Sequence, residues 1–422
     1  MLNRTIAPPL REITNLYLPK PEIIHLDNGI PVYINNMGTQ PVVKMELVFQ
    51  AGRWKEEQKL ISRATSRLLK EGTVQKSGAD IAEFVDFYGA SIGFPASLDN
   101  SNVVLFSLTK HFDKLLPLVD DILTRPAFAE DDIDKFKRRS LQRMKMDTSK
   151  TDVIAYRKIT EAIFGKNHPY GYNSQSKLFE NISRSAIVKH FDNHYRAGNV
   201  TIFLSGSPTD NVLENLNNTL GRNLPKGKTQ PKSAIIAPFE HRKIHIPKQQ
   251  NLQTAIRIGR RTFNRNHADY KGFYILNTIL GGYFGARLMT NLREDKGYTY
   301  GVYSSTEPML YDGYFTIPTE VAKGAANDAI REIYGEFKRL REELISDDEM
   351  QMVRNYILGY LLNGLDGPFN VTEIIKTFVT EGVDVSYYDD LVHEVKTITP
   401  ERLRNLANKY LREEDMYEVV VG

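Results

Sequence analysis

The sequence contains no cysteine among its 422 residues. The chain can therefore form no disulfide, no thiolate metal site and no cysteine nucleophile, although this absence does not choose between a reducing and an oxidising compartment. It also has little excess of either charge, because 55 Lys and Arg face 52 Asp and Glu, and no local basic patch is evident. This near balance argues against a protein that binds nucleic acid or a membrane surface.

Long apolar runs are missing as well. The longest, such as Val103 to Leu108, are far shorter than the roughly 20 residues that a membrane-spanning helix requires. Met1 to Leu10 has one basic residue and two prolines but no apolar core of signal-peptide length. We therefore expect a cytoplasmic protein without a transmembrane helix, and a periplasmic one only if a leader precedes this sequence.

The length and composition indicate a folded chain of two domains. Apolar residues make up 41% and charged residues 25% of the sequence, which is typical of globular proteins and unlike disordered or collagenous chains. A single hydrophobic core rarely extends over 422 residues, so two core-bearing domains are expected.

An internal repeat supports this division. Ser183 to Gly206 is predicted to form a helix followed by a short strand, Val200 to Leu204. The pattern recurs about 210 residues later, at the end of the chain. There Thr399 is a candidate N-cap, Pro400 takes the first helical position, and Tyr417 to Val421 forms the closing strand.

A second matching pair lies earlier in each half. Phe112 to Leu123 is a helix pattern followed by the acidic start of a long helix at Glu130. Ala326 to Leu340 leads similarly into Ser346 and Glu349, which have capping-box spacing. Strand patterns precede both pairs at Ile30–Ile34, Val42–Phe49 and Val103–Leu108, and at Lys243–Ile246, Thr254–Ile258 and Tyr314–Ile317.

The boundary between the halves is predicted from composition. Pro225 to Pro238 contains three prolines and little apolar periodicity, as a linker does. We therefore expect an N-terminal domain over residues 1–225, a linker over 226–238 and a C-terminal domain over 239–422.

Five segments, spread over nearly the whole chain, carry a family resemblance: Leu26–Gly29, Leu69–Thr73, His168–Gly171, Leu280–Leu288 and, most specific, Leu292–Tyr300. They resemble the M16 peptidase family, the zinc proteases that include pitrilysin and the mitochondrial processing peptidase. The resemblance implies an α+β chain of two homologous domains, each a mostly antiparallel mixed sheet with helices packed on it. This is the LuxS/MPP-like metallohydrolase fold.

Active members of this family bind zinc through an inverted H-x-x-E-H helix and a more distant glutamate. At the matching positions this sequence has Arg63 and Arg67 for the histidines, Ser66 for the glutamate that activates water, and Gln142 and Arg143 near the distant ligand. Residues four apart share a helix face, so two imidazoles there could bind one ion. Guanidinium groups offer only donors and stay protonated. We therefore expect a degenerate zinc site and no metal or other cofactor in this chain.

The same helix also has an ordinary structural interpretation. An apolar stripe runs along it at Leu60, Ile61, Ala64, Leu68 and Leu69. Arg63 and Arg67 would then lie on a solvated or partner-facing side. The alternative is that these arginines contact acidic groups of a partner or a peptide, as guanidinium forks can.

Two histidine pairs imitate the lost motif. His190 and His194 are four residues apart on a predicted helix, but Asn193, at the place of the glutamate, cannot act as a general base. His241 and His245 have the same spacing on a segment predicted to be extended. A metal site is not expected at either pair, and the first pair is predicted to consist of surface or packing histidines.

Arg293 and Tyr300 keep the second-half pattern of the family. In related two-subunit enzymes, the resemblance implies, this pair reaches the substrate carbonyl from the subunit that lacks the zinc. A phenol and a guanidinium can donate hydrogen bonds to an oxygen that gains negative charge. The structural alternative is that Arg293 pairs with Glu294 or Asp295 and that Tyr300 packs in the sheet.

The leading hypothesis is a zinc-free subunit of a heterodimeric M16-type metallopeptidase, inactive alone, that encloses peptides and supplies Arg293 and Tyr300 to a zinc-bearing paralogue. Self-association is the alternative to that heterodimer. Two other functions stay open: a non-catalytic peptide-binding or assembly protein, and an independent zinc peptidase that uses His190 and His194.

Overall fold

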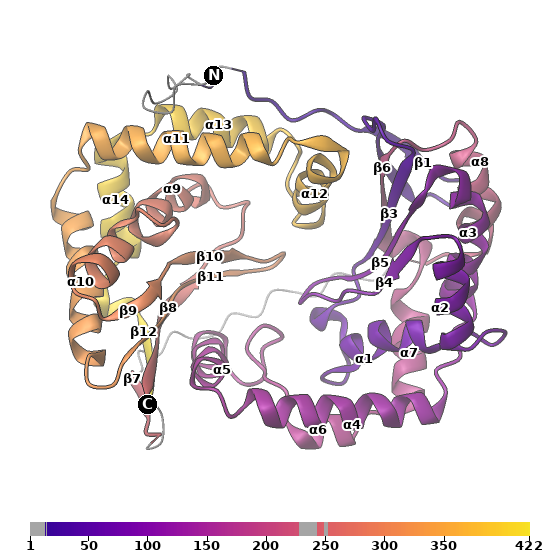
Figure 1. The fold of residues 1–422 in the computed structure, drawn as a ribbon, viewed down its shortest axis with the longest axis horizontal. Helices are drawn as coiled ribbons and strands as arrows, with labels where there is room; N and C mark the ends of the chain where they lie inside the picture. Colours follow the sequence, from indigo (N-terminus) through magenta and orange to yellow (C-terminus); the bar gives the residue numbers. More distant parts are fainter. Residues whose placement is uncertain (1–12, 14, 228–242, 249–251) are drawn as a thin grey trace, which may run out of the picture.

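The computed structural model describes residues 13, 15–227, 243–248 and 252–422, and within these ranges the chain forms two six-stranded sheets with helices packed on them (Figure 1). The first sheet has the strand order β1-β2-β6-β3-β5-β4. Its strands are β1 (Glu22–His25), β2 (Pro31–Asn35), β3 (Val42–Phe49), β4 (Ser91–Gly93), β5 (Ser101–Leu108) and β6 (Val200–Gly206). Neighbours are antiparallel except β2 and β6, which run parallel.

The second sheet repeats this plan. Its order is β10-β11-β8-β12-β7, and β9 also pairs with β11. The strands are β7 (Lys243–Ile246), β8 (Gln253–Thr262), β9 (Thr299–Val302), β10 (Ser305–Pro308), β11 (Gly313–Ala322) and β12 (Tyr417–Val421). Only the pair of β12 with β7 is parallel among these described strands. The predicted α+β fold with two mostly antiparallel mixed sheets is confirmed.

Several helices follow in the same order in both halves. The first half contains α1 (Ile61–Leu68), α2 (Gly78–Phe87), α3 (Thr109–Thr124), α4 (Glu130–Asp147), α5 (Thr151–Phe164), α6 (Ser176–Glu180), α7 (Arg184–His194) and α8 (Val212–Leu216). The second contains α9 (Tyr270–Gly281), α10 (Ala326–Glu342), α11 (Asp347–Asn363), α12 (Gly367–Thr380), α13 (Tyr387–Thr397) and α14 (Pro400–Tyr410). The order α3, α4, α5, α7, β6 corresponds to α10, α11, α12, α14, β12, so the predicted repeat is confirmed.

Short helical turns complete the chain. They are η1 (Arg53–Lys55), η2 (Leu69–Glu71), η3 (Ala197–Asn199), η4 (Asn217–Gly221), η5 (Met289–Asp295) and η6 (Glu413–Asp415). In the described ranges, no helix combines the length and the apolar character that crossing a bilayer would take. The predicted linker, 226–238, lies outside the described residues from position 228 onward, and the domain boundaries stay a prediction.

Local sequence explains several helix ends. The Thr399 side chain accepts a hydrogen bond from the Arg402 N–H, and Pro400 is the first residue of α14, as predicted. Ser346 caps α11 by accepting from the Glu349 N–H. The predicted capping box forms only in part, because the Glu349 carboxylate accepts two hydrogen bonds from Arg287, at 2.8 and 2.7 Å.

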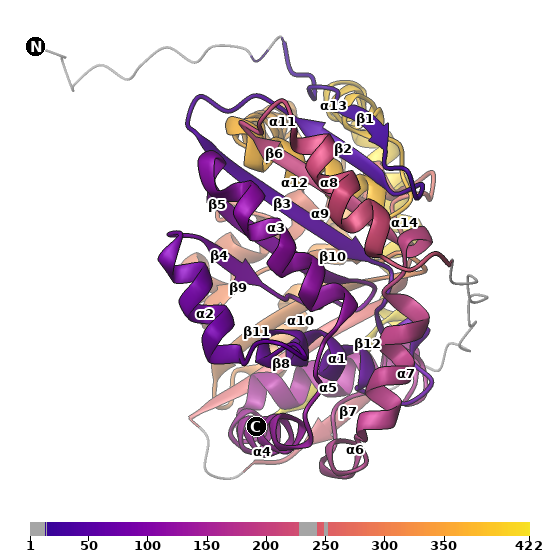
Figure 2. The ribbon, with the colours of Figure 1, turned by 90° about the vertical axis from the view of Figure 1, so that its right-hand side faces the viewer.

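One helix of each half packs on the sheet of the other half. Helix α5 lies against β8, β11 and β12 of the second sheet, whereas α12 lies against β6 and β2 of the first sheet (Figure 1). Figure 2 shows α2, α3 and α8 on the side of the first sheet that faces away from the second half. We call α5 and α12 the exchanged helices, because each packs on the sheet of the other half. They therefore connect the two halves.

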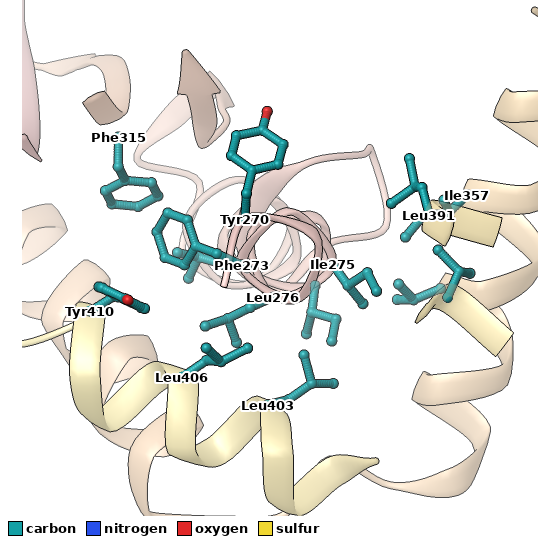
Figure 3. Close-up of a cluster of buried hydrophobic side chains, with 14 of the residues drawn as sticks. Tyr270, Phe273, Ile275, Leu276, Phe315, Ile357, Leu391, Leu403, Leu406 and Tyr410 are labelled. Atoms are coloured by element: carbon teal, nitrogen blue, oxygen red, sulfur yellow. The ribbon is translucent and has the colours of Figure 1, made fainter. Parts of the chain in front are cut away.

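Three hydrophobic clusters form the core. One belongs to the first half and one mainly to the second, where Phe273 of α9 contacts Tyr410 and Phe315 at ring distances of 5.3 and 5.7 Å (Figure 3). The third joins the halves, since Ile159 of α5 lies in one cluster with Val419 of β12.

Candidate degenerate zinc site and second-half Arg/Tyr pair

Helix α1 holds the positions that correspond to the family's zinc motif. All five residues of its predicted apolar stripe are buried, at Leu60, Ile61, Ala64, Leu68 and Leu69. Leu60, just before the helix, has a left-handed backbone with φ 74°, and its N–H donates to the Tyr172 hydroxyl at 3.3 Å. The helix is thus fixed by its apolar face, and its other face is left for polar side chains.

The polar positions of α1 have different surroundings. Ser66 is fully buried, and its hydroxyl donates to the Phe94 carbonyl at 3.2 Å. Arg63 is half-buried and Arg67 is exposed. Gln142 and Arg143 are both exposed on α4, which packs against α1.

Four arginines meet at this place. Burial lowers the pKa of the Arg63 guanidinium, and the positive charges of Arg67, Arg53 and Arg143 lower it further. The structure therefore brings the predicted positions 63, 67 and 143 together. Arg53, which was not among the predicted site residues, comes from η1 and donates to the carbonyls of Pro169 and Tyr172 at 3.3 and 3.1 Å. No motif surrounds Arg53, so local sequence gave no signal for it.

These side chains do not fit a zinc ion. Guanidinium groups have no lone pair to offer a metal and repel a cation, and the Ser66 hydroxyl already donates within the fold. Among the residues that the structure describes, no group of three or more His, Asp or Glu side chains could hold a metal ion.

The histidine pair on α7 lies inside the fold, at the edge of a cavity of about 200 Å³. His190 and His194 are both buried, their rings lie 4.6 Å apart, and the His190 Nε2 lies 3.1 Å from the Ala51 carbonyl. Only one residue of the second pair is described by the structure. His245 is exposed on β7, whereas His241 lies outside the described residues.

Arg293 and Tyr300 lie on consecutive elements of the second half. Arg293, in η5, is half-buried and places its guanidinium carbon 5.0 Å from the centre of the Phe284 ring. Within the described ranges it forms no ion pair with Glu294 or Asp295. Tyr300, on β9, is 87% exposed and does not pack in the sheet. This exposure contradicts the alternative in which Tyr300 packs in the sheet, and the role of the pair stays a prediction.

Tyr300 stands at a cavity of about 420 Å³. It is lined by Arg257 of β8, by Glu320 of β11 and by Tyr303, which directly follows β9, and Asp152 of α5 lines it from the first half. The Thr151 hydroxyl donates to Glu320 at 3.0 Å, which fixes the start of α5 against this wall. The exchanged helix thus completes a pocket on the second sheet.

Comparison with known proteins agrees with this arrangement. Residues 181–357 match the family model of the peptidase M16 inactive domain. The chain is 22% identical over 392 residues, 92% of this chain and 95% of the relative, to the uncharacterized zinc protease YmxG of Bacillus subtilis. It is 20% identical over 342 residues, 78% of this chain and 77% of the relative, to the non-peptidase homolog YmxG of Helicobacter pylori.

Solved structures share the whole fold. A peptidase M16 inactive domain from Pseudomonas fluorescens superposes with a TM-score of 0.88 at 24% identity, covering 95% of this chain and 98% of that one. A protease from Helicobacter pylori gives 0.85 at 17% identity, covering 96% and 100%. A chain of Complex III2 from Candida albicans gives 0.76 at 15% identity, covering 95% of both chains.

The fold and the altered site define a two-domain protein of the M16 type without the zinc-binding side chains. The chain is similar to members of the M16 peptidase family, among them some that are described as inactive.

Proposed function

We propose that this chain is the zinc-free subunit of a heterodimeric M16-type peptidase. It helps to enclose peptide substrates and supplies Arg293 and Tyr300 to the active site of a zinc-bearing paralogue. The zinc and the residue that activates water belong to that partner, since this chain has arginines and a buried serine at those positions.

One observation carries the proposal. The positions that match the zinc ligands have lost the required side chains, whereas the Arg293 and Tyr300 pair is kept. The metal-binding positions hold guanidinium groups, whereas Tyr300 is 87% exposed on β9 and open to a ligand. An exposed phenol at the edge of a cavity can reach a ligand, because neither its ring nor its hydroxyl is enclosed by the fold.

The chemistry expected of this pair is transition-state stabilisation. The peptide carbonyl oxygen gains negative charge when water attacks its carbon, and the Tyr300 hydroxyl and the Arg293 guanidinium would donate hydrogen bonds to it. Fixed donors of this kind strengthen as the charge develops, so they increase kcat more than they tighten substrate binding.

The test combines the chain with an H-x-x-E-H paralogue and measures peptide cleavage. The mixture should cleave faster than the paralogue alone, and Tyr300→Phe or Arg293→Ala should lower kcat about a hundredfold. Tyr303→Phe is the matched control, because Tyr303 lines the same cavity and is 56% exposed. Cleavage that is unaffected by this chain, or by Arg293→Ala, would contradict the proposal.

A second candidate function is a non-catalytic peptide-binding or assembly protein. It is favoured by the fold shared with a chain of Complex III2 and by the relative named a non-peptidase homolog. A pull-down from the native organism separates the two. A stable complex without any zinc-bearing paralogue would favour assembly, and recovery of such a paralogue would favour the heterodimer.

A further inference from the structure

The four arginines at the altered metal site form a cationic cluster that the fold assembles from three elements. Arg53 comes from η1, Arg63 and Arg67 from one face of α1, and Arg143 from α4. We call these four residues the arginine cluster. In Figure 1, α1 lies between α5 and α7 and directly above α4.

The charge of Arg53 acts on two buried carboxyl groups, Glu56 and Asp99, which are hydrogen-bonded to other groups. Glu56 accepts hydrogen bonds from the Ser62 N–H and hydroxyl at 2.9 and 2.6 Å and from the Tyr172 hydroxyl at 2.6 Å. Burial raises the pKa of Glu56 despite these bonds. Asp99 accepts from the Tyr170 hydroxyl and from the Leu310 N–H, and burial raises its pKa too. Both carboxyls thus favour the neutral form more than an exposed carboxyl does.

Three of the four guanidinium groups in the arginine cluster have no carboxylate partner within the described residues. In the described part of the chain, Arg63, Arg67 and Arg143 form no ion pair, and Arg67 and Arg143 are exposed. Like charges held together repel one another, and half-burial of Arg63 weakens the screening by water. An anion bound between them would remove this repulsion.

The geometry of the guanidinium group favours a carboxylate as the bound anion. Arginine presents a planar fork of donors that matches a carboxylate in two parallel hydrogen bonds. Arg67 and Arg143 lie on facing helices, so one carboxylate between α1 and α4 can contact both while the half-buried Arg63 adds its charge. A peptide offers two sources of this group: an acidic side chain and the C-terminal carboxylate.

We propose that the arginine cluster is a carboxylate-binding site that takes an acidic side chain or the C-terminus of a peptide. The site occupies the place where active M16 members hold zinc. It requires no catalytic partner and no cleavage, so its test is independent of the proposed role of Arg293 and Tyr300.

The experiment titrates the isolated full chain with three peptides of one neutral sequence, followed by calorimetry. The first contains two internal glutamates and an amidated C-terminus, the second has only a free C-terminus, and the third has neither charge. We expect the first or the second to bind more tightly than the third, and the tighter one identifies the source. Binding should weaken as salt is added.

Variants connect the binding to the cluster. Arg67→Gln and Arg143→Gln should each weaken binding of the charged peptide about tenfold, as loss of a charged hydrogen bond does. Both side chains are exposed, so folding should be retained, which the thermal transition verifies. Arg331→Gln is the matched control, because Arg331 is 73% exposed on α10. Equal binding of all three peptides, or an Arg67→Gln affinity equal to that of wild type, would overturn the proposal.

Discussion

Arg63 and Arg67 lie one helical turn apart on α1, in the geometry that would let two histidines bind one ion. The helical spacing at these two positions would suit two metal ligands, but the guanidinium groups present there offer no lone pair to a metal. Ser66, at the place of the glutamate that activates water, has a short side chain that is fully buried and donates to the Phe94 carbonyl, so it cannot act as a general base. At the residue scale, the change is one of ligand chemistry and not of fold.

Restoring ligands on this backbone should restore metal binding. The triple variant Arg63→His, Arg67→His, Arg143→Glu is expected to bind zinc stoichiometrically, measured by elemental analysis after dialysis. It should gain no peptidase activity, because Ser66 cannot act as a general base.

The control for the triple variant keeps both histidine substitutions but places the glutamate one residue earlier. It carries Gln142→Glu in place of Arg143→Glu. Adjacent helical residues point about 100° apart, and Arg143 is the one whose charge acts on Arg63. The zinc affinity of the control should therefore be lower by more than about tenfold. A tenfold loss is what removal of a residue that only hydrogen-bonds to a metal ligand typically causes. Equal affinity of the two variants would show that α4 is oriented differently.

Local patterns predicted much of the fold and only part of this site. The stripe on α1 and the cap at Thr399 follow from side-chain periodicity and capping chemistry, which act over a few residues. Arg53 joins the cluster only through tertiary packing, so no spacing could indicate it. Glu349 has the capping-box position, yet a charged partner from a distant segment, Arg287, takes its carboxylate.

At the element scale, the exchange of α5 and α12 joins the two halves of the repeat. An amphipathic helix pattern shows which face will be buried but not which sheet will cover it. For this reason the exchange could not be predicted from the sequence. Its consequence is that α5 contributes both to the core under the second sheet and to the wall of the Tyr300 cavity.

Truncation of a buried residue on α5 should therefore destabilise the second half as well as the first. Ile159 is 0% exposed in the cluster shared with β12, and Ile159→Ala should lower the free energy of unfolding by about 2–5 kcal/mol. Ile23→Ala is the matched control, because Ile23 is 50% exposed on β1. Urea denaturation followed by circular dichroism measures both, and equal effects would mean that α5 is not held in this position.

At the scale of the whole molecule, polar contacts also connect the halves through α12. The Asn35 side chain donates to the Pro368 carbonyl at 3.1 Å. Lys376 of α12 forms an ion pair with Glu46 of β3 at 3.0 Å, and Lys44 reaches the other oxygen of Glu46 at 3.1 Å. Glu46 is only 4% exposed, so water screens the attraction between these charges less than it does in a surface pair.

Acid should weaken the connection between the halves through Glu46. Burial by itself would raise the pKa of this carboxyl, but Lys376 and Lys44 outweigh burial and lower it below 4.5. A lowered pKa in the folded chain gives stability that is present above the pKa of the unfolded chain and is lost as the pH falls through the folded value. The free energy of unfolding should therefore drop between about pH 5 and pH 3. In Glu46→Gln the drop should be shallower, because this group no longer titrates.

The variant separates Glu46 from the other carboxyls of the network. At neutral pH, Glu46→Gln should cost about 2 kcal/mol, since Lys376 and Lys44 lose a charged, buried acceptor. Glu373 also pairs with both lysines but its side chain is 52% exposed, so Glu373→Gln should cost less than about 1 kcal/mol. Urea unfolding at several pH values measures both variants. If their pH profiles coincide, the stability that this ion pair gives the whole molecule does not come from the buried carboxylate on β3.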